Sequence, residues 1–391
     1  MNQATLWYSQ SFIYPIATLS GTIIGVGLFS LPYITSKVGF WIMLGYFLVL
    51  GSLVILIHQI FGELALKTPD LKRLPGFAKF HLGNLGEKIA LISTILGILG
   101  TILAYLIVGG QFLTNLLLPI FGGNSLLYTL LYFLIGAIFI YFGIKPISKV
   151  EFSDLILFFI ILILIFFWGR GLINIQNLFL IKHPFHGYPK LKIENFFLPY
   201  GPILFSLWGA ALIPEIEEML GPKKELLRKI IPLTILIVAI FYLLFIFLVT
   251  GICGNRTSPD AISGLENFLG KELAKFLFLF GTFVTFTSFI ALGLTLEKVF
   301  WYDLKIEKNI AWAITCFPPL ILFLVGVRQF IPVISFIGGV ALGIEGILIL
   351  LMYQKIKLKT QKSKFKSYLL VYPLILIFLG GIVYEIIYFI K

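Results

Sequence analysis

The sequence predicts an all-α polytopic membrane protein, and three observations support this prediction. Hydrophobic residues make up 59% of the 391 residues and charged residues only 12%, which leaves too little polar surface for a soluble domain of this size. The apolar stretches are continuous rather than alternating, which favours helices over the strands of a β-barrel. Two of these stretches are interrupted by glycine near their centres, and they lie five spans apart in the chain.

Hydropathy predicts eleven transmembrane helices, because each apolar stretch is long enough for one crossing of a bilayer. They cover approximately residues 12–34, 41–64, 89–116, 126–143, 152–169, 196–220, 230–253, 274–299, 310–325, 331–353 and 368–390. A short helix across the outer face is expected after Ser258-Pro259-Asp260, since serine caps helices and proline suits the first helical position. The whole chain, residues 1–391, is expected to form a single transmembrane domain.

Basic residues predict the orientation in a cytoplasmic membrane. With the N-terminus inside, the cytoplasmic loops hold 20 of the 30 Lys and Arg residues. These 20 are Lys67, Lys72, Arg73, Lys79, Lys88, Lys145, Lys149, Lys223, Lys224, Arg228, Lys229, Lys298, Lys305, Lys308, Lys355, Lys357, Lys359, Lys362, Lys364 and Lys366. The positive-inside rule therefore favours an inside N-terminus and an outside C-terminus. The net charge of +12 is thus explained by topology, and we expect the lipid bilayer rather than nucleic acid as the partner of these residues.

The first span contains the stretch Ser20-Gly21-Thr22-Ile23-Ile24-Gly25-Val26-Gly27. Glycine costs roughly 1 kcal/mol relative to alanine inside a helix, so three glycines near the centre of a span predict an unwound segment that lines a binding cavity. The alternative is a packing face, because Gly21 and Gly25 have GxxxG spacing.

A second interruption, Ser206-Leu207-Trp208-Gly209-Ala210-Ala211, lies in the sixth span. Two broken helices in corresponding positions predict a five-plus-five inverted repeat, here about 12–169 and 196–353, with an extra C-terminal helix at about 368–390. Half-helix N-termini that meet at the midplane favour an anionic group, and free carbonyls favour an amino group or a cation. A zwitterionic amino acid satisfies both requirements.

Three stretches carry a resemblance to known families. The run from Gly21 to Pro32 resembles the first span of the amino acid/auxin permease and hydroxy/aromatic amino acid permease families. Ile203 to Pro214 with Leu226-Leu227-Arg228-Lys229 resembles their sixth span and its exit, and Thr287 to Leu294 resembles their eighth. These families belong to the amino acid–polyamine–cation superfamily, so the resemblance implies a leucine-transporter-type fold and alternating-access symport.

The resemblance also implies roles for individual residues. The substrate-binding residues would be Thr22, Gly25, Gly27, Ser206, Trp208 and Gly209. A cation would bind through backbone carbonyls and hydroxyls of Gly21, Ile24, Val284, Thr287 and Ser288. The lysine that some proton-coupled relatives carry in the fifth span is missing from residues 152–169. Alternatively, Thr287 and Ser288 bond only to carbonyls of their own helix, and Thr101 and Tyr105 of the third span either face the substrate or pack in the core.

Ionisable residues inside the spans are expected to have a functional or structural role, because a charge at the bilayer centre costs roughly 3 kcal/mol or more. Glu345 and Glu215 are the candidates for proton coupling, since neither reaches water easily from a regular helix. The others lie near helix ends, where we expect them to reach water or to pair with loop lysines: His58, Glu63, Glu217, Glu218 and Glu297.

These observations predict a secondary active transporter coupled to Na⁺ or H⁺, and the resemblance implies hydrophobic or aromatic amino acids as its substrates. The chain contains no nucleotide-binding or catalytic motif, so we expect neither an enzyme nor a cofactor. His183 and His186 share a polar loop, but Pro184 separates them and no metal site is expected. The alternatives are a sensor that binds an amino acid without transporting it, as in spore-germinant receptor subunits, and a structural or partner-binding subunit.

Overall fold

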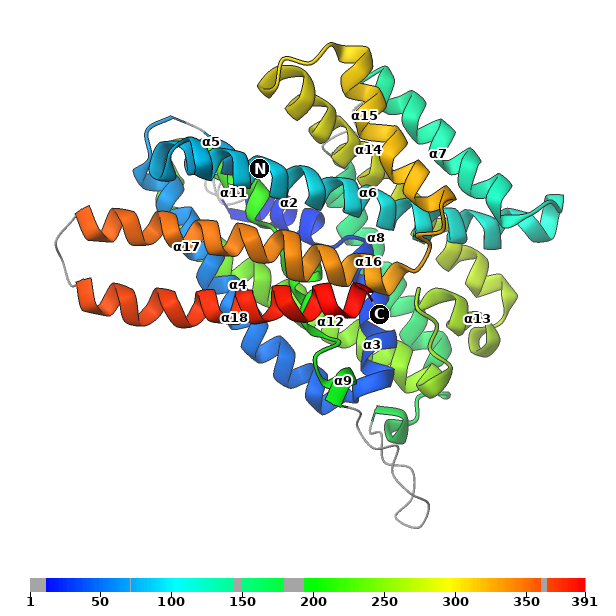
Figure 1. Ribbon diagram of the computed structural model, residues 1–391. Helices are drawn as coiled ribbons and strands as arrows, with labels where there is room; N and C mark the ends of the chain where they lie inside the picture. The colour runs from blue at the N-terminus through cyan, green and yellow to red at the C-terminus, as the bar shows by residue number, and fades with distance from the viewer. Residues whose placement is uncertain (1–11, 71, 144–148, 179–192, 360–363, 391) are drawn as a thin grey trace, which may run out of the picture.

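A computed structural model describes residues 12–70, 72–143, 149–178, 193–359 and 364–390 (Figure 1). The expectations for Lys145 and Lys362 and for the loop with His183 and His186 fall outside these residues. The described residues form helices and contain no strand. The helices are α2 (Tyr14–Ile23), η2 (Val26–Ser30), α3 (Leu31–Val38), α4 (Phe40–Lys67), α5 (Leu74–Leu82), α6 (Asn84–Phe121), α7 (Ser125–Tyr141), α8 (Lys149–Gly169), η3 (Ile175–Leu178), α9 (Ile193–Phe196), α10 (Tyr200–Leu207), η4 (Ala210–Leu212), α11 (Ile213–Leu220), η5 (Gly221–Leu226), α12 (Leu227–Cys253), η6 (Gly254–Arg256), α13 (Ile262–Leu269), α14 (Lys271–Lys298), η7 (Val299–Asp303), α15 (Lys308–Leu324), α16 (Phe330–Phe336), η8 (Ile337–Ala341), α17 (Leu342–Lys359) and α18 (Lys364–Ile390).

A helix or a chain of helices lies at each predicted span. Within the described residues, six helices are long and apolar enough to cross a membrane, or seven if the bent pair at residues 14–38 counts as one span. Three further apolar helices are shorter, namely Ser125–Tyr141, Ile156–Gly169 and Lys308–Leu324. The all-helical membrane class is therefore confirmed, while the number of eleven spans stays a prediction.

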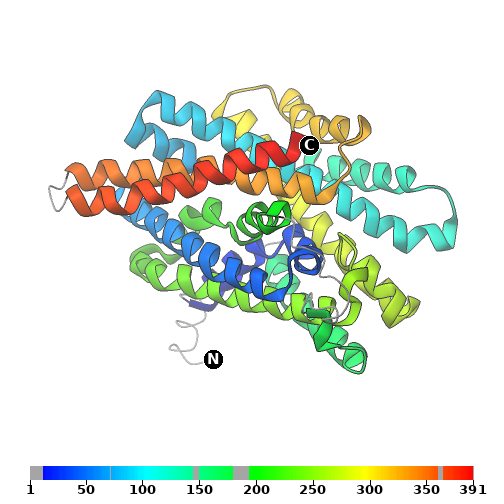
Figure 2. The same cartoon turned by 60° about the horizontal axis from the view of Figure 1, so that its bottom comes forward.

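The helices form two groups by their contacts, and α7, α14 and α15 of the second group lie together at the upper right of Figure 1. In one group α2, α4, α10, α11 and α12 pack together, and in the other α6, α7, α14 and α15 pack together. The elements α8, α16, η8 and α17 contact members of both groups. Helices α17 and α18 lie side by side along their length, as both views show (Figures 1 and 2).

Two local predictions need correction. The outer helix α13 begins at Ile262, later than the expected start after Ser258, because the Ser258 hydroxyl accepts a hydrogen bond from the Gly264 N–H (2.7 Å) instead of capping a helix at 259. The tenth span is not one regular helix, because η8 is a π-helical segment between α16 and α17.

Candidate functional site

The first span is broken at the predicted glycines. Helix α2 ends at Ile23, and the chain continues after Ile24 and Gly25 as the short helix η2. Gly25 is extended (φ −127°, ψ −156°), and the two halves of the span meet at a bend of 50°. The interruption is therefore a true break in the helix, as the glycine spacing predicts, and not only a packing face.

The sixth span is broken in the same manner. Helix α10 ends at Leu207, Trp208 adopts an extended backbone (φ −80°, ψ 120°), and helix α11 begins at Ile213 after the short helix η4. Each break leaves backbone N–H and C=O groups outside the helical hydrogen-bond pattern, where they are free to bind a ligand.

The two breaks lie against each other. A side-chain carbon at Gly27 would lie 2.5 Å from the Ser206 hydroxyl, and one at Gly209 would lie 2.7 Å from Ile23. Each break thus uses a glycine to approach the other, since any larger residue would push the two spans apart. The structure therefore places Gly27 against Ser206 and Gly209 against Ile23, while substrate binding by Gly27, Ser206 and Gly209 stays a prediction.

The Tyr242 hydroxyl of α12 contacts both breaks. The hydroxyl oxygen lies 2.8 Å from the carbonyl oxygen of Ile23 and 3.0 Å from that of Ser206, and the ring is fully buried. These are carbonyls at the ends of α2 and α10, so one side chain binds the end of both half-helices. Tyr242 is not among the residues predicted from the sequence, where its one signal is a hydroxyl inside an apolar span, a group that usually has a partner when buried.

His58 of α4 holds the second break. Its Nδ1 lies 2.8 Å from the Val54 carbonyl oxygen, and its Nε2 lies 2.8 Å from the backbone nitrogen of Gly209. Because a carbonyl only accepts and an N–H only donates, Nδ1 carries the proton and Nε2 accepts, which makes the ring neutral. The expectation that His58 reaches water or a loop lysine is wrong, because the ring is fully buried.

Trp208 connects the second break to Glu345. The indole Nε1 donates to Glu345 Oε2 at 3.0 Å, and the hydroxyl of Thr94 donates to Oε1 at 3.4 Å. The Trp208 ring packs edge-on against His58, with 5.0 Å between ring centroids. Glu345 is buried, and none of the ion pairs among the described residues includes it. The carboxyl group therefore touches the break through a neutral donor.

The other residues proposed to face the substrate lie in different surroundings. A side-chain carbon at Gly25 would lie 2.5 Å from the Tyr105 hydroxyl, so Tyr105 of α6 covers the first break from the second helix group. Thr22 is exposed, and its hydroxyl donates to the Thr18 carbonyl of its own helix at 3.1 Å. Thr101 likewise donates to Gly97 at 2.7 Å.

The proposed cation-binding residues are only partly gathered. Gly21, Ile24 and Val284 line one small cavity of about 10 Å³. The aromatic rings of Phe158 and Phe280 line it as well, along with Gly25, Leu28 and Phe29. The hydroxyl of Thr287 donates to the Val284 carbonyl at 3.0 Å, which is the local bond considered as the alternative. Ser288 is not among the residues that line this cavity.

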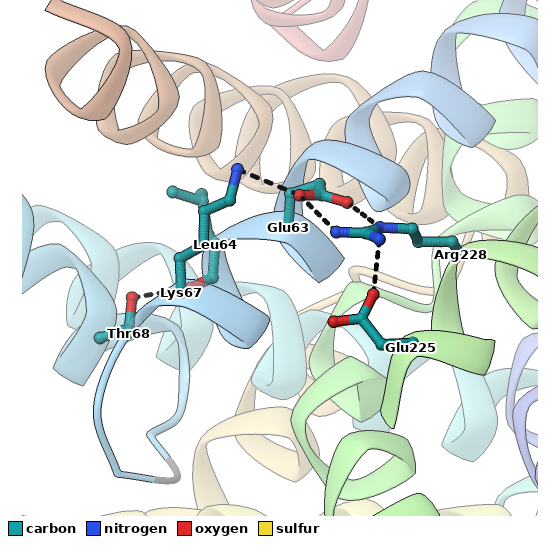
Figure 3. A network of polar contacts seen from close by, with 6 residues as sticks. All are labelled: Glu63, Leu64, Lys67, Thr68, Glu225 and Arg228. Carbon is teal, nitrogen blue, oxygen red and sulfur yellow. Dashed lines mark hydrogen bonds and ion pairs between the residues drawn. The ribbon is translucent and has the colours of Figure 1, made fainter. Parts of the chain in front are cut away.

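Two carboxylates near the helix ends, Glu63 and Glu217, form ion pairs as expected. The expectation is wrong for Glu297, which is buried, has no hydrogen-bond partner for its Oε1 and is in none of the ion pairs among the described residues. Glu63, at the end of α4, contacts Arg228 of α12 and Lys67, and Arg228 also contacts Glu225 (Figure 3). Glu217 lies 3.5 Å from Lys224.

Glu215 differs from Glu345 in its contacts with charge and solvent. It lies 4.0 Å from Arg73, and its side chain is 39% exposed. Of the two carboxylates proposed for coupling, only Glu345 is therefore buried beside the breaks.

The sequence matches the tryptophan/tyrosine permease family over residues 8–388. The chain belongs to this family. The chain is also similar to "Tyrosine-specific transport system 1" of Haemophilus influenzae. The two are 25% identical over 339 residues, which cover 82% of each chain.

Solved structures of other transporters share the fold of this permease. MhsT in complex with L-phenylalanine matches with a TM-score of 0.64 and 14% identity over 96% of this chain and 98% of that one. Mhp1, a nucleobase-cation-symport-1 family transporter, matches with a TM-score of 0.65 and 11% identity over 96% and 90%. The leucine-transporter-type fold and the role in secondary amino acid transport are thus confirmed, and the chain is a membrane permease rather than an enzyme.

Proposed function

We propose that this permease carries an aromatic amino acid, and that the substrate binds between the two broken spans. The family and the tyrosine-specific relative support an aromatic substrate. The observation that carries the site is the mutual contact of the breaks, Gly27 against Ser206 and Gly209 against Ile23. The breaks would supply N–H groups for the substrate carboxylate and carbonyls for its amino group.

The side chains around the breaks suit an aromatic substrate. Trp208 lies in the second break, Phe205 approaches Gly27 of the first break, and Tyr105 covers Gly25. Aromatic rings bind other aromatic rings in edge-on or offset geometry, which adds about 0.5–1.5 kcal/mol to the burial of apolar area. Thr22, Gly25 and Gly209 remain proposed substrate contacts, with Thr22 the one that the structure supports least.

We further infer that protons drive the transport, through Glu345. Its buried carboxyl touches Trp208 at the break, so a change in its charge acts directly on the substrate site. The alternative is a cation at Gly21, Ile24, Val284, Thr287 and Ser288, which is less favoured because aromatic rings line the small cavity there. Glu215 is also less favoured as a proton carrier because Arg73 lies beside it.

The orientation and the internal repeat complete the proposal. An inside N-terminus follows from the basic loops, and two five-span halves follow from the matching positions of the breaks. One helix group would then rock against the other around the site, with an additional helix, α18, at the C-terminus.

Counterflow of labelled amino acids in proteoliposomes tests this function. We expect exchange of tyrosine, tryptophan or phenylalanine, and accumulation against a concentration gradient when a pH gradient is imposed. Glu345→Gln should abolish the accumulation but retain counterflow, because exchange needs no net proton movement. Thr287→Ala, the matched variant at the cation site, should leave the accumulation intact.

Three outcomes would contradict the proposal. Binding without counterflow would favour an amino acid sensor. Accumulation that follows a sodium gradient and is lost in Thr287→Ala would assign coupling to the cation site. If Glu345→Gln and Glu215→Gln each retain pH-driven uptake, neither carboxylate couples transport to protons.

A further inference from the structure

Another buried carboxyl group lies on the C-terminal helix α18. Glu385 is only 1% exposed. Its Oε1 accepts a hydrogen bond from the backbone N–H of Gly201 at 3.1 Å, and Oε2 has no hydrogen-bond partner among the described residues. Gly201 is the second residue of α10, so Glu385 binds the start of the outer half of the broken sixth span.

Three elements meet around this carboxyl group. Side-chain carbons at Gly201 or at Gly339 of η8 would collide with Glu385, so both glycines allow α10 and η8 to reach it. A carbon at Gly201 would also lie 2.8 Å from the Ser335 backbone of α16. The π-helical segment that interrupts the tenth span is therefore packed directly on this group.

The titratable side chains that face Glu385 are tyrosines. They are Tyr46 of α4, Tyr200 of α10 and Tyr388 of α18. The elements α16 and η8 contribute no titratable side chain, and none of the ion pairs among the described residues includes Glu385. A carboxylate here thus has a helix N-terminus as its partner in place of a cation.

Two opposing effects make the contact depend on the charge of Glu385. A helix N-terminus attracts an anion, so the ionised group binds the Gly201 N–H strongly. Burial without a counter-charge favours the neutral group, whose hydrogen bond to the N–H is weaker. Adding a proton therefore loosens the link between α18 and α10.

Glu385 also lies near a route to solvent. Tyr388, about one helical turn further along α18, lines a cavity of about 710 Å³ at the predicted outer end of the molecule. Lys37 of α3, Gln111 of α6 and Arg328 line the same cavity. A proton that enters this cavity from the outer solution would reach the carboxyl group by passing Tyr388.

We propose that Glu385 is a proton-binding site that controls the outer half of the broken sixth span. When ionised, it holds the start of α10 against α18 and η8. When protonated, it releases α10, which moves as the substrate site opens or closes toward the outer cavity. The proposal rests on the transport function, and it adds a second proton site to the one at Glu345.

Homoexchange at varied external pH and constant internal pH tests this role. In the wild-type protein we expect the exchange rate to change by about fivefold or more with external pH, the lower end of typical couplings between a ligand and a conformational change. Glu385→Gln keeps the oxygen that accepts from Gly201 but cannot titrate, so its profile should be flatter than the wild-type one, and any pH dependence that remains belongs to Glu345. Glu272→Gln is the matched control, because Glu272 is 84% exposed and, within the part of the chain that the structure describes, forms an ion pair with Lys275 alone.

The possible outcomes separate this proposal from the transport function. A flat wild-type profile, or a Glu385→Gln profile equal to the wild-type one, overturns the role of Glu385 while exchange itself persists. A wild-type protein without exchange overturns the transport function instead. If Glu385→Gln does not fold, Glu385→Asp must show a displaced profile, and an unchanged profile overturns the proposal.

Discussion

At the scale of single residues, the site depends on glycines where backbones or hydroxyl groups approach closely. Gly25 leaves room for the Tyr105 hydroxyl, which lies 2.5 Å from the position of a first side-chain carbon. Tyr105 comes from the other helix group, so this contact connects the two parts that have to move relative to each other.

Gly25→Leu should abolish uptake while membrane insertion and expression are retained. The added side chain would displace the Tyr105 hydroxyl, and overpacking of this kind costs about 1–3 kcal/mol. Gly45→Leu is the control, because Gly45 of α4 has nothing within 4 Å of its missing side chain. Uptake assays on both variants decide the matter, and normal uptake by Gly25→Leu would restore the view that the glycines only pack helices.

The sequence predicts the residues that line the breaks in the first and sixth spans. It does not predict the residues that bind the backbone near these breaks from other helices. Glycine spacing directly predicts unwinding, because glycine weakens helices wherever it lies. His58, Tyr242 and Glu385 act on carbonyl and N–H groups that are more than 30 residues away in the chain. No local pattern encodes such contacts, and each residue gave only the signal of a polar group inside an apolar span.

At the scale of elements, the start of α13 shows how a short helix is fixed. Asp260 accepts hydrogen bonds from the hydroxyls of Ser258 (2.5 Å) and Ser263 and from the Ser263 N–H (3.3 Å). Asn115 of α6 donates to the Ser263 hydroxyl at 2.9 Å. This polar cluster therefore both starts α13 and attaches it to α6.

Asp260→Ala should lower the midpoint of thermal unfolding, because loss of a helix-start acceptor costs about 1 kcal/mol. Asp260→Asn should retain most of the stability, since asparagine provides an equivalent acceptor. Unfolding of the purified protein followed by circular dichroism compares the two variants. Equal midpoints for both would show that the Asp260 contacts add nothing.

The same carboxyl group predicts a pH dependence. Burial raises the pKa of Asp260 above its ordinary value of 3.8, although the bonds from Ser258 and Ser263 oppose the rise. The folded state then binds the proton more tightly than the unfolded chain, so the stability from this group is greatest below pH 3.8 and falls as the pH rises toward the folded-state pKa. Asp260→Asn should remove this fall, which unfolding midpoints across the acidic range would reveal.

Element boundaries were predictable where local residues decide them and not elsewhere. Apolar runs placed the long helices, but the π-helical η8 arises because Gly338 and Gly339 allow α10 and α18 to pack against it. Helix α5, in a loop between two predicted spans, was missed because it is short and lies outside the apolar runs. Contacts between elements shape both features.

At the scale of the whole molecule, the two helix groups predict what moves together. Helices α4 and α12 belong to one group, and Glu63 and Arg228 join them at the end that the basic loops assign to the cytoplasm (Figure 3). Tyr33 of α3, which packs against α4 and α12 of the first group, and Gln111 of α6 in the second group line the outer cavity. Alternating access requires the distance between Tyr33 and Gln111 to change. The distance between Glu63 and Arg228 should stay constant.

Cross-linked cysteine pairs separate these two cases. The pair Glu63→Cys and Arg228→Cys should retain counterflow after reaction with a short bifunctional thiol reagent, because both helices move as one body. The pair Tyr33→Cys and Gln111→Cys should lose counterflow when joined across the cavity and regain it when the cross-link is cleaved. The native thiols of Cys253 and Cys316 are buried, so they should react little. Loss of counterflow in the first pair alone would contradict the grouping, because it would place the moving boundary between α4 and α12.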